Sequence, residues 1–181
     1  GEIAAQAVWG RREAERLPAS TPRRLTNVVF MGMGEPLANL DVTVGAVRWL
    51  TDPGAFGLSA RGITVSTVGV ADKLATFFAT TRAELAISIN APDDARRSAI
   101  MPINERFDLR ALREALVSAL PPRRRVLFQY ALVAGFNDAL ADADALAAWI
   151  GDIPCRVNVI PANPGPDPAL VSPSDAHVDA F

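Results

Sequence analysis

The chain has 181 residues, half of them hydrophobic, and a formal net charge of −2. This size predicts one globular domain over residues 1–181, and the near-neutral charge provides no overall positive field to attract nucleic acid. The single cysteine excludes an internal disulfide and fits a cytoplasmic location, and no apolar run or N-terminal signal pattern indicates a membrane span or secretion.

Helix and strand patterns alternate along the chain. Apolar periodicity predicts helices at 2–16, 40–51, 71–80 and 139–150, and further helices that begin after the capping residues Asp108 and Ser174. A polar, proline-containing linker at 18–24 follows the first helix. Apolar and β-branched runs predict strands at 27–31, 63–68, 85–90, 126–132 and 156–160. Because a helix separates each pair of strands, the pattern predicts an α/β fold with parallel strands and right-handed crossovers.

Polar residues follow the predicted strands at their carboxyl ends. They are Gly34, Glu35, Ser66, Thr67, Ser88, Asn90, Gln129, Tyr130, Asn158 and Asn163. In parallel α/β folds these ends meet at one edge, where ligands bind, so the residues predict a binding cleft. Alternatively, they only cap the helices that follow, and for Ser66 taken alone this is the better interpretation.

The turn Gly32–Leu37, directly after the first strand, is the most informative segment. Its two glycines allow backbone torsions that other residues avoid, and Pro36 favours an extended conformation at Glu35. Free carbonyl groups and one carboxylate suit an ammonium group better than a phosphate. The alternative is an ordinary connection between a strand and a helix.

Several sequence blocks resemble one family in the order in which they occur. They are 29–37 (VFMGMGEPL), 63–69 (ITVSTVG), 85–94 (LAISINAPDD), 101–104 (MPIN), 136–138 (FND) and 154–164 (PCRVNVIPANP). The chain resembles the radical S-adenosylmethionine (radical SAM) adenine-C2 RNA methyltransferases of the RlmN type, to which the Cfr type is related.

The resemblance implies a partial six-unit radical SAM (TIM-like) barrel of parallel strands that binds S-adenosylmethionine across the strand ends. By this analogy Gly34 and Glu35 hold the methionine amino group, Ser66, Ser88, Ile89 and Asn90 contact the methionine and ribose portions, and Asn163 lies near the adenosine. Two positions depart from the family pattern. Asn90 replaces a common histidine, and Gln129 stands where glutamate is frequent.

The resemblance also implies the reaction, which is methylation of adenine C2 in 23S ribosomal RNA, with transfer RNA as an alternative substrate. The family works with a [4Fe-4S] cluster held by three cysteines after the first barrel strand, a methyl-carrying cysteine beyond the last strand, and an electron donor such as flavodoxin. The parent enzyme is expected to be a monomer without a membrane partner. Cys155 matches neither cysteine position and is expected to be a structural thiol, so we expect the chain alone to lack the first strand and the cluster loop, and to be inactive.

Two rival functions remain open at this level. One is another radical SAM class, because a Gly-Glu-Pro turn also occurs in glycyl-radical activating enzymes. The other is a non-catalytic domain that binds S-adenosylmethionine or a partner.

Charged and aromatic residues outside these blocks are expected to have ordinary roles. We expect solvated helix surface at Arg96, Arg97, Arg106, Arg110 and Arg113 rather than contacts to RNA phosphates. The turn 123–125, which is all arginine, and His177 are expected to be exposed. Packing between helices and sheet is expected for Trp9, Trp49 and Trp149.

Overall fold

The computed structural model describes residues 1–18, 20–21, 24–163 and 170–181. Residues 19, 22 and 23 of the predicted linker and Pro164 of the last family block therefore lie outside the described residues. Five parallel strands form one sheet in the order β1-β2-β3-β4-β5. Their bounds are β1 (Val28–Phe30), β2 (Ile63–Thr67), β3 (Glu84–Ser88), β4 (Val126–Leu132) and β5 (Cys155–Pro161). The predicted α/β class with parallel strands is confirmed.

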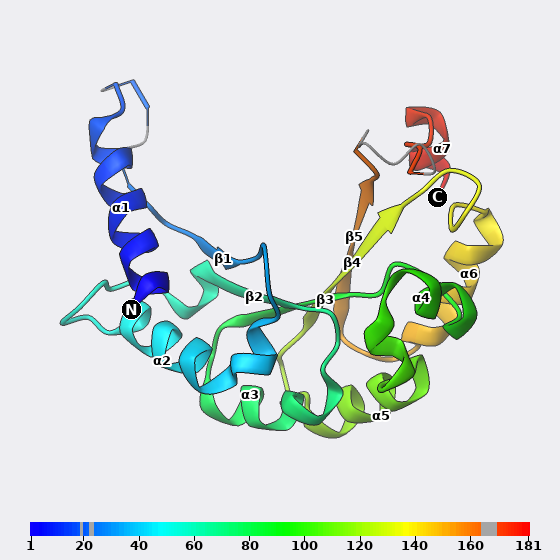
Figure 1. Ribbon diagram of the computed structural model, residues 1–181, viewed down its shortest axis with the longest axis horizontal. Helices are drawn as coiled ribbons and strands as arrows, with labels where there is room; N and C mark the ends of the chain where they lie inside the picture. Colours follow the sequence, from blue (N-terminus) through cyan, green and yellow to red (C-terminus); the bar gives the residue numbers. More distant parts are fainter. Residues whose placement is uncertain (19, 22–23, 164–169) are drawn as a thin grey trace.

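Helices cover the outer, convex face of the curved sheet (Figure 1). The α-helices are α1 (Glu2–Arg16), α2 (Leu40–Thr51), α3 (Leu74–Thr80), α4 (Asp94–Ile100), α5 (Leu109–Ala119), α6 (Leu140–Ile150) and α7 (Asp175–Ala180). Short 3-10 helices are η1 (Pro36–Asn39), η2 (Ala60–Gly62), η3 (Ala71–Lys73) and η4 (Pro102–Glu105). Since each strand pairs with the next one in the sequence, the arrangement is a partial barrel.

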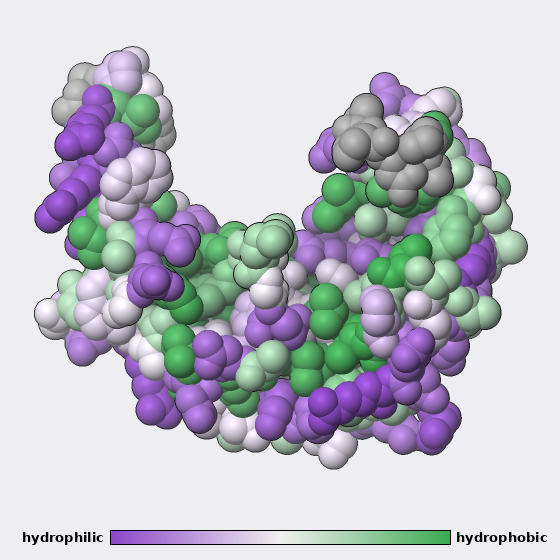
Figure 2. All heavy atoms as spheres, in the orientation of Figure 1, coloured by the Kyte–Doolittle hydropathy of each residue, from purple (hydrophilic) through white to green (hydrophobic). Residues whose placement is uncertain are grey.

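Alternation along the strands separates a buried face from an open one. Phe128 is fully buried, and its ring lies 5.4 Å from that of Trp149 on α6. Because successive side chains of a strand point to opposite faces, Gln129 lies on the other, concave face of the sheet. On β2 the same alternation buries Ile63 and Val65 and leaves Ser66 partly exposed. Figure 2 shows the concave face as an open hollow between an arm that contains α1 and an arm that contains β5 and α7.

The two sides of the sheet differ in extent. Strands β4 and β5 pair over seven residues each, whereas β1 pairs with β2 over only three, from Val28 to Phe30. The side chain of Val29 on β1 is 51% exposed, and that of Met31 directly after it is 61% exposed. The β1 side of the sheet is therefore the more open one.

Most predicted elements are confirmed to within two residues at each end, including the capping of α5 and α7. The Asp108 carboxylate accepts the Ala111 N–H at 2.7 Å, and the Ser174 hydroxyl accepts the His177 N–H at 3.3 Å. Helix α4 was not predicted. No helix among the described residues is long and apolar enough to cross a membrane.

The expectation for Trp9 is wrong. Trp9 is 67% exposed, because α1 lies beside the edge of the sheet instead of covering its face. His177 lies partly exposed at the surface, and its Nε2 lies 3.2 Å from the carboxylate of Asp138 in the loop before α6.

Candidate ligand-binding site

The turn after β1 has the backbone that its glycines predicted. Gly32 and Gly34 have φ values of +132° and +99°, which side chains with a Cβ rarely adopt. Glu35, before Pro36, is extended with φ −118° and ψ 110°. Among the described residues, no donor reaches the carbonyl oxygens of Met33 or Gly34. These carbonyls are therefore free to accept hydrogen bonds from a ligand.

A groove of about 720 Å³ runs along this turn. Helix α1 forms one wall with residues such as Ile3 and Ala7, and β1 and the turn form the other wall. Only part of the lining is polar, and the Glu35 carboxylate is its one acidic group among the described residues.

The Glu35 carboxylate is already engaged with the backbone. Oε1 accepts the Leu37 N–H and Oε2 accepts the Val68 N–H, both at 2.9 Å. The bond to Val68 joins the turn after β1 to the segment after β2. The Glu35 carboxylate therefore fixes the turn through both of its oxygens. Each oxygen keeps a further lone pair.

Polar side chains from neighbouring strands meet on the concave face. The Ser66 hydroxyl on β2 donates to Gln129 Oε1 on β4 at 3.1 Å, although β3 lies between the two strands. This reach is possible because β3 places Ala86 opposite Ser66 and Ser88 opposite Gln129, and both side chains are small. Asn158 on β5 is the next residue in the same row, opposite Gln129. We call this row of Ser66, Ser88, Gln129 and Asn158 the polar row.

The other predicted site residues take different places. Asn163 is exposed and lies two residues after the end of β5. Ile89 is fully buried and its N–H donates to the Gln129 carbonyl at 2.9 Å, so only its backbone lies near the concave face.

Asn90 completes the edge of the sheet with its side chain. It has φ +58°, the left-handed conformation that asparagine tolerates better than most residues. Its Oδ1 accepts the Ala131 N–H at 3.0 Å, and its Nδ2 lies 3.4 Å from the sulfur of Met101. Both the oxygen and the nitrogen of the Asn90 amide thus already make contacts within the protein.

Asn137 is a supporting residue that the sequence analysis quoted only as part of a family block. It is fully buried, and its Nδ2 donates to the carbonyls of Asn90 and Ala131 at 2.7 Å each. Its Oδ1 accepts the Val133 N–H at 2.7 Å, and its own carbonyl accepts the Tyr130 hydroxyl. One amide therefore fixes the ends of β3 and β4 relative to each other.

The expectation for Arg97 is wrong, because its side chain is fully buried. Nη2 donates to the Val68 carbonyl at 2.8 Å, and Nη1 donates to Asn104 Oδ1 at 2.6 Å and to the Phe107 carbonyl at 3.2 Å. Burial lowers the pKa of this guanidinium. Glu35 and Arg97 thus hold Val68 from its N–H and its carbonyl respectively.

Arg96 is also engaged instead of solvated. Its guanidinium forms a two-pronged contact with the buried Asp142 on α6, at 2.6 and 2.9 Å, and Nε donates to Asp93 at 2.6 Å. Both carboxylates raise the pKa of Arg96, and Asp142 makes the larger contribution. Hydrogen bonds from Arg96 in turn lower the pKa of Asp93. The ion pair fastens α4 to α6.

The remaining arginines of this set lie at the surface in ion pairs. The pairs are Arg106–Asp72, Arg110–Glu114 and Arg113–Asp152. Such exposed pairs fit the predicted solvated surface.

The residues of this chain do not fit an iron–sulfur cluster. Cys155 is the only cysteine, it packs against the hydrophobic core, and burial raises the pKa of its thiol, whereas cluster ligands are thiolates. Within the described ranges no group of three or more metal-ligating side chains occurs. The polar row and the free carbonyls after β1 do fit the ammonium, hydroxyl and carboxylate groups of S-adenosylmethionine.

Comparison with known proteins identifies the chain as similar to radical SAM methyltransferases. It is 63% identical over 157 residues to a probable RNA methyltransferase of Sorangium cellulosum. The aligned region covers 87% of this chain and 39% of that protein. It is 44% identical over 156 residues to a dual-specificity RNA methyltransferase RlmN of Geotalea uraniireducens, covering 86% of this chain and 46% of the relative. No protein-family model matches the chain.

Solved structures agree with this similarity. A crystal structure of a radical SAM methyltransferase from Sphaerobacter thermophilus superposes with a TM-score of 0.91 and 37% identity, over 99% of this chain and 52% of that one. A domain of a pyruvate-formate lyase-activating enzyme from Bacteroides vulgatus superposes with a TM-score of 0.64 at 16% identity, which shows the shared fold alone. The resemblance predicted from the sequence is confirmed, and the chain spans about half or less of the length of the two RNA methyltransferases and of the radical SAM methyltransferase structure.

Proposed function

We propose that the chain is the central, S-adenosylmethionine-binding part of an RlmN-type radical SAM methyltransferase that methylates C2 of adenine in 23S ribosomal RNA, with transfer RNA as a second substrate. The observation that carries the proposal is the polar row on the concave face of a parallel sheet, in a chain 63% identical to a probable RNA methyltransferase. The electron donor, the cytoplasmic location and the monomeric state predicted from the sequence are part of the same proposal.

In this proposal the turn after β1 receives the methionine end of the cofactor. The carbonyls of Met33 and Gly34 accept hydrogen bonds from its ammonium group, and Glu35 keeps those carbonyls in place through its bonds to Leu37 and Val68. The charge of Glu35 adds attraction for the ammonium. Glu35 is thus chiefly a positioning residue.

The polar row receives the remaining polar groups. Ser66, Ser88 and Gln129 offer donors and acceptors to the carboxylate and ribose, and Asn163 lies at the adenosine end. Asn90 and Ile89 contribute through the backbone that they fix at the end of β3. S-adenosylmethionine supplies the methyl group and the radical precursor, while cluster ligands must come from outside these residues.

Calorimetric titration of S-adenosylmethionine tests the proposal. We expect measurable binding by the chain and a loss of about tenfold in the Ser88→Val variant, which removes a hydroxyl from the polar row and narrows it. Ser118→Val is the matched control, because Ser118 is exposed on α5 and lies away from the concave face. Equal affinities in the two variants, or no binding by the unaltered chain, would reject the site. The RNA target is tested separately, by mass spectrometry of ribosomal RNA digests from cells with and without the gene.

A further inference from the structure

Arg97 on α4 is a charged side chain that is fully buried. Among the described residues it forms no ion pair, and its Nε has no hydrogen-bond partner. Its other donors meet three neutral oxygens, which belong to Val68, Asn104 and Phe107. Because burying a charge without a counter-ion is costly, and apolar residues of similar volume can stabilise a core equally well, packing alone does not account for an arginine at this position.

One of these oxygens leads directly to the turn that carries the candidate cofactor site. Arg97 Nη2 donates to the Val68 carbonyl at 2.8 Å, and the Val68 N–H donates to Glu35 Oε2 at 2.9 Å. Glu35 Oε1 in turn accepts the Leu37 N–H at 2.9 Å. The buried guanidinium is therefore connected through a single residue, Val68, to the carboxylate that fixes the turn after β1.

The contact between Arg97 and the segment after β2 is close. Gly69 has φ +97°, and a Cβ at this position would lie 3.2 Å from Arg97 Nη2 and 3.1 Å from Leu112 Cδ2. The guanidinium is also held by Asn104, whose Oδ1 accepts a hydrogen bond from Nη1 at 2.6 Å. Because the guanidinium is itself fixed and the backbone fits closely against it, Arg97 sets the position of the Val68 carbonyl.

We propose that Arg97 is a positioning residue for the methionine end of S-adenosylmethionine, acting through Val68 and Glu35 on the turn after β1. The inference rests on the proposed function, in which the carbonyls of Met33 and Gly34 bind the ammonium group of the cofactor. Because Arg97 is fully buried, it acts on the turn without touching the cofactor. Its loss lets Val68 and the Glu35 carboxylate shift, so the carbonyls no longer converge on the ammonium, while binding of the adenosine end is unaffected.

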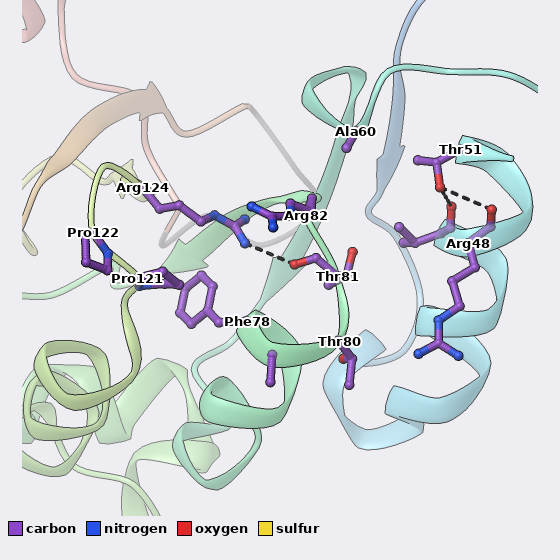
Figure 3. Close-up of a pocket in the computed structure, with 12 residues that line it drawn as sticks. Arg48, Thr51, Ala60, Phe78, Thr80, Thr81, Arg82, Pro121, Pro122 and Arg124 are labelled. Carbon is purple, nitrogen blue, oxygen red and sulfur yellow. Dashed lines mark hydrogen bonds between the residues drawn. The ribbon is translucent and has the colours of Figure 1, made fainter. Parts of the chain in front are cut away.

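Two other arginines provide matched controls. Arg96, the neighbour of Arg97 on α4, also donates several hydrogen bonds, but its fork meets Asp142 on α6 and not the segment after β2. Arg48 on α2 lies at the opposite, amino ends of the strands, beside a pocket of about 580 Å³. It is exposed, and Figure 3 shows its guanidinium pointing away from Arg82 and Arg124.

Arg124 is not suitable as an exposed control. It is partly buried rather than exposed as expected for the turn 123–125, whereas the other two arginines of the turn are exposed. Its guanidinium donates to the carbonyls of Thr81 and Ala83 and lies over the ring of Phe78. Replacing Arg124 would therefore disturb contacts within the protein.

Calorimetric titration of three ligands tests the proposal. S-adenosylmethionine carries both the ammonium and the carboxylate, its decarboxylated form keeps only the ammonium, and methylthioadenosine lacks both groups. Arg97→Lys keeps the charge but loses the forked geometry of the donors. We expect it to weaken binding of the first two ligands about tenfold and that of methylthioadenosine by less than about twofold. Arg96→Lys and Arg48→Lys should leave the ratio of the S-adenosylmethionine and methylthioadenosine affinities unchanged.

The pattern across the ligands separates positioning from general support of the fold. A uniform loss for all three ligands in Arg97→Lys, a loss confined to S-adenosylmethionine, or unchanged affinities would overturn the proposal. If the unaltered chain does not bind S-adenosylmethionine, the proposed function is rejected and this inference with it. If urea unfolding shows that Arg97→Lys does not fold, Asn104→Ala provides the same test, because it removes the oxygen that fixes Nη1 and leaves the arginine in place. We expect a loss of about threefold from this variant, with the same ligand pattern.

Discussion

The two ends of the sheet are built on different principles. At the carboxyl ends, buried side chains such as Arg97 and Asn137 donate to backbone carbonyls and fix the loops that carry the candidate cofactor site. At the amino ends, Arg48 and Arg82 extend from exposed positions beside an open pocket. The loops at the carboxyl ends are thus fixed by hydrogen bonds within the protein, whereas Arg48 and Arg82 at the amino ends are exposed to solvent. Substitutions at Arg97 or Asn137 should therefore cost more stability than substitutions at Arg48 or Arg82.

The largest expected effect is at Arg97. Arg97→Met keeps most of the apolar stem but leaves the Val68 carbonyl, Asn104 Oδ1 and the Phe107 carbonyl without this donor. We expect the free energy of unfolding to fall by about 3 kcal/mol or more, since each unsatisfied buried group costs on the order of 1–3 kcal/mol. Urea unfolding followed by circular dichroism measures it.

Arg48→Met is the matched control at the amino end. Because Arg48 is exposed, its replacement should change the unfolding free energy by less than about 0.5 kcal/mol. A similar loss in both variants would remove the distinction between the two ends.

A smaller effect is expected at Glu35. Glu35→Gln replaces one carboxylate oxygen by an NH2 group that faces a backbone N–H of Leu37 or Val68. We expect a loss of about 1–2 kcal/mol in unfolding free energy and weaker S-adenosylmethionine binding, because the turn is no longer fixed at both oxygens. Thermal unfolding and calorimetry provide the two readouts. Glu105→Gln, at an exposed position of η4, serves as the control. Normal cofactor affinity in the Glu35→Gln variant would show that this turn is not part of the site.

The smallest effect concerns pH and Asp93. Hydrogen bonding to Arg96 lowers the pKa of Asp93 below its ordinary value of 3.8. A lowered pKa in the folded state means that the contribution is present above that value and is lost as the pH falls through the folded pKa. The melting temperature should therefore decrease below about pH 4, and less steeply in Asp93→Asn than in the unaltered chain. Parallel slopes in the two proteins would contradict the assignment.

The sequence predicted the framework well and the supporting contacts poorly. Strand β4 was predicted with its exact bounds because a largely apolar run directly follows the basic turn at 123–125. Helix α4 was missed because seven residues with two adjacent arginines carry little apolar periodicity. A signal was available in Asp93, three residues before Arg96, which is the spacing of a helix cap.

The burial of Arg97 could not be read from local sequence. It depends on contacts with Val68, Asn104 and Phe107, which are brought together only by the tertiary fold.

Ser66 and Ser88 lie at the carboxyl ends of β2 and β3, as predicted. Gln129 and Asn158 instead lie in the middle of β4 and β5, because both strands continue for three residues beyond them. The hydrogen bond from Ser66 to Gln129 was not predicted, since it depends on the small Ala86 between them.

The double attachment of Val68 has a consequence for local opening. The Val68 N–H donates to Glu35 in the turn after β1, and the Val68 carbonyl accepts from Arg97 on α4. Opening of either the turn or α4 therefore breaks a hydrogen bond of Val68. Three stretches far apart in the chain therefore form one cooperative unit of hydrogen exchange, and a ligand that protects the turn would also slow exchange around α4 and η4.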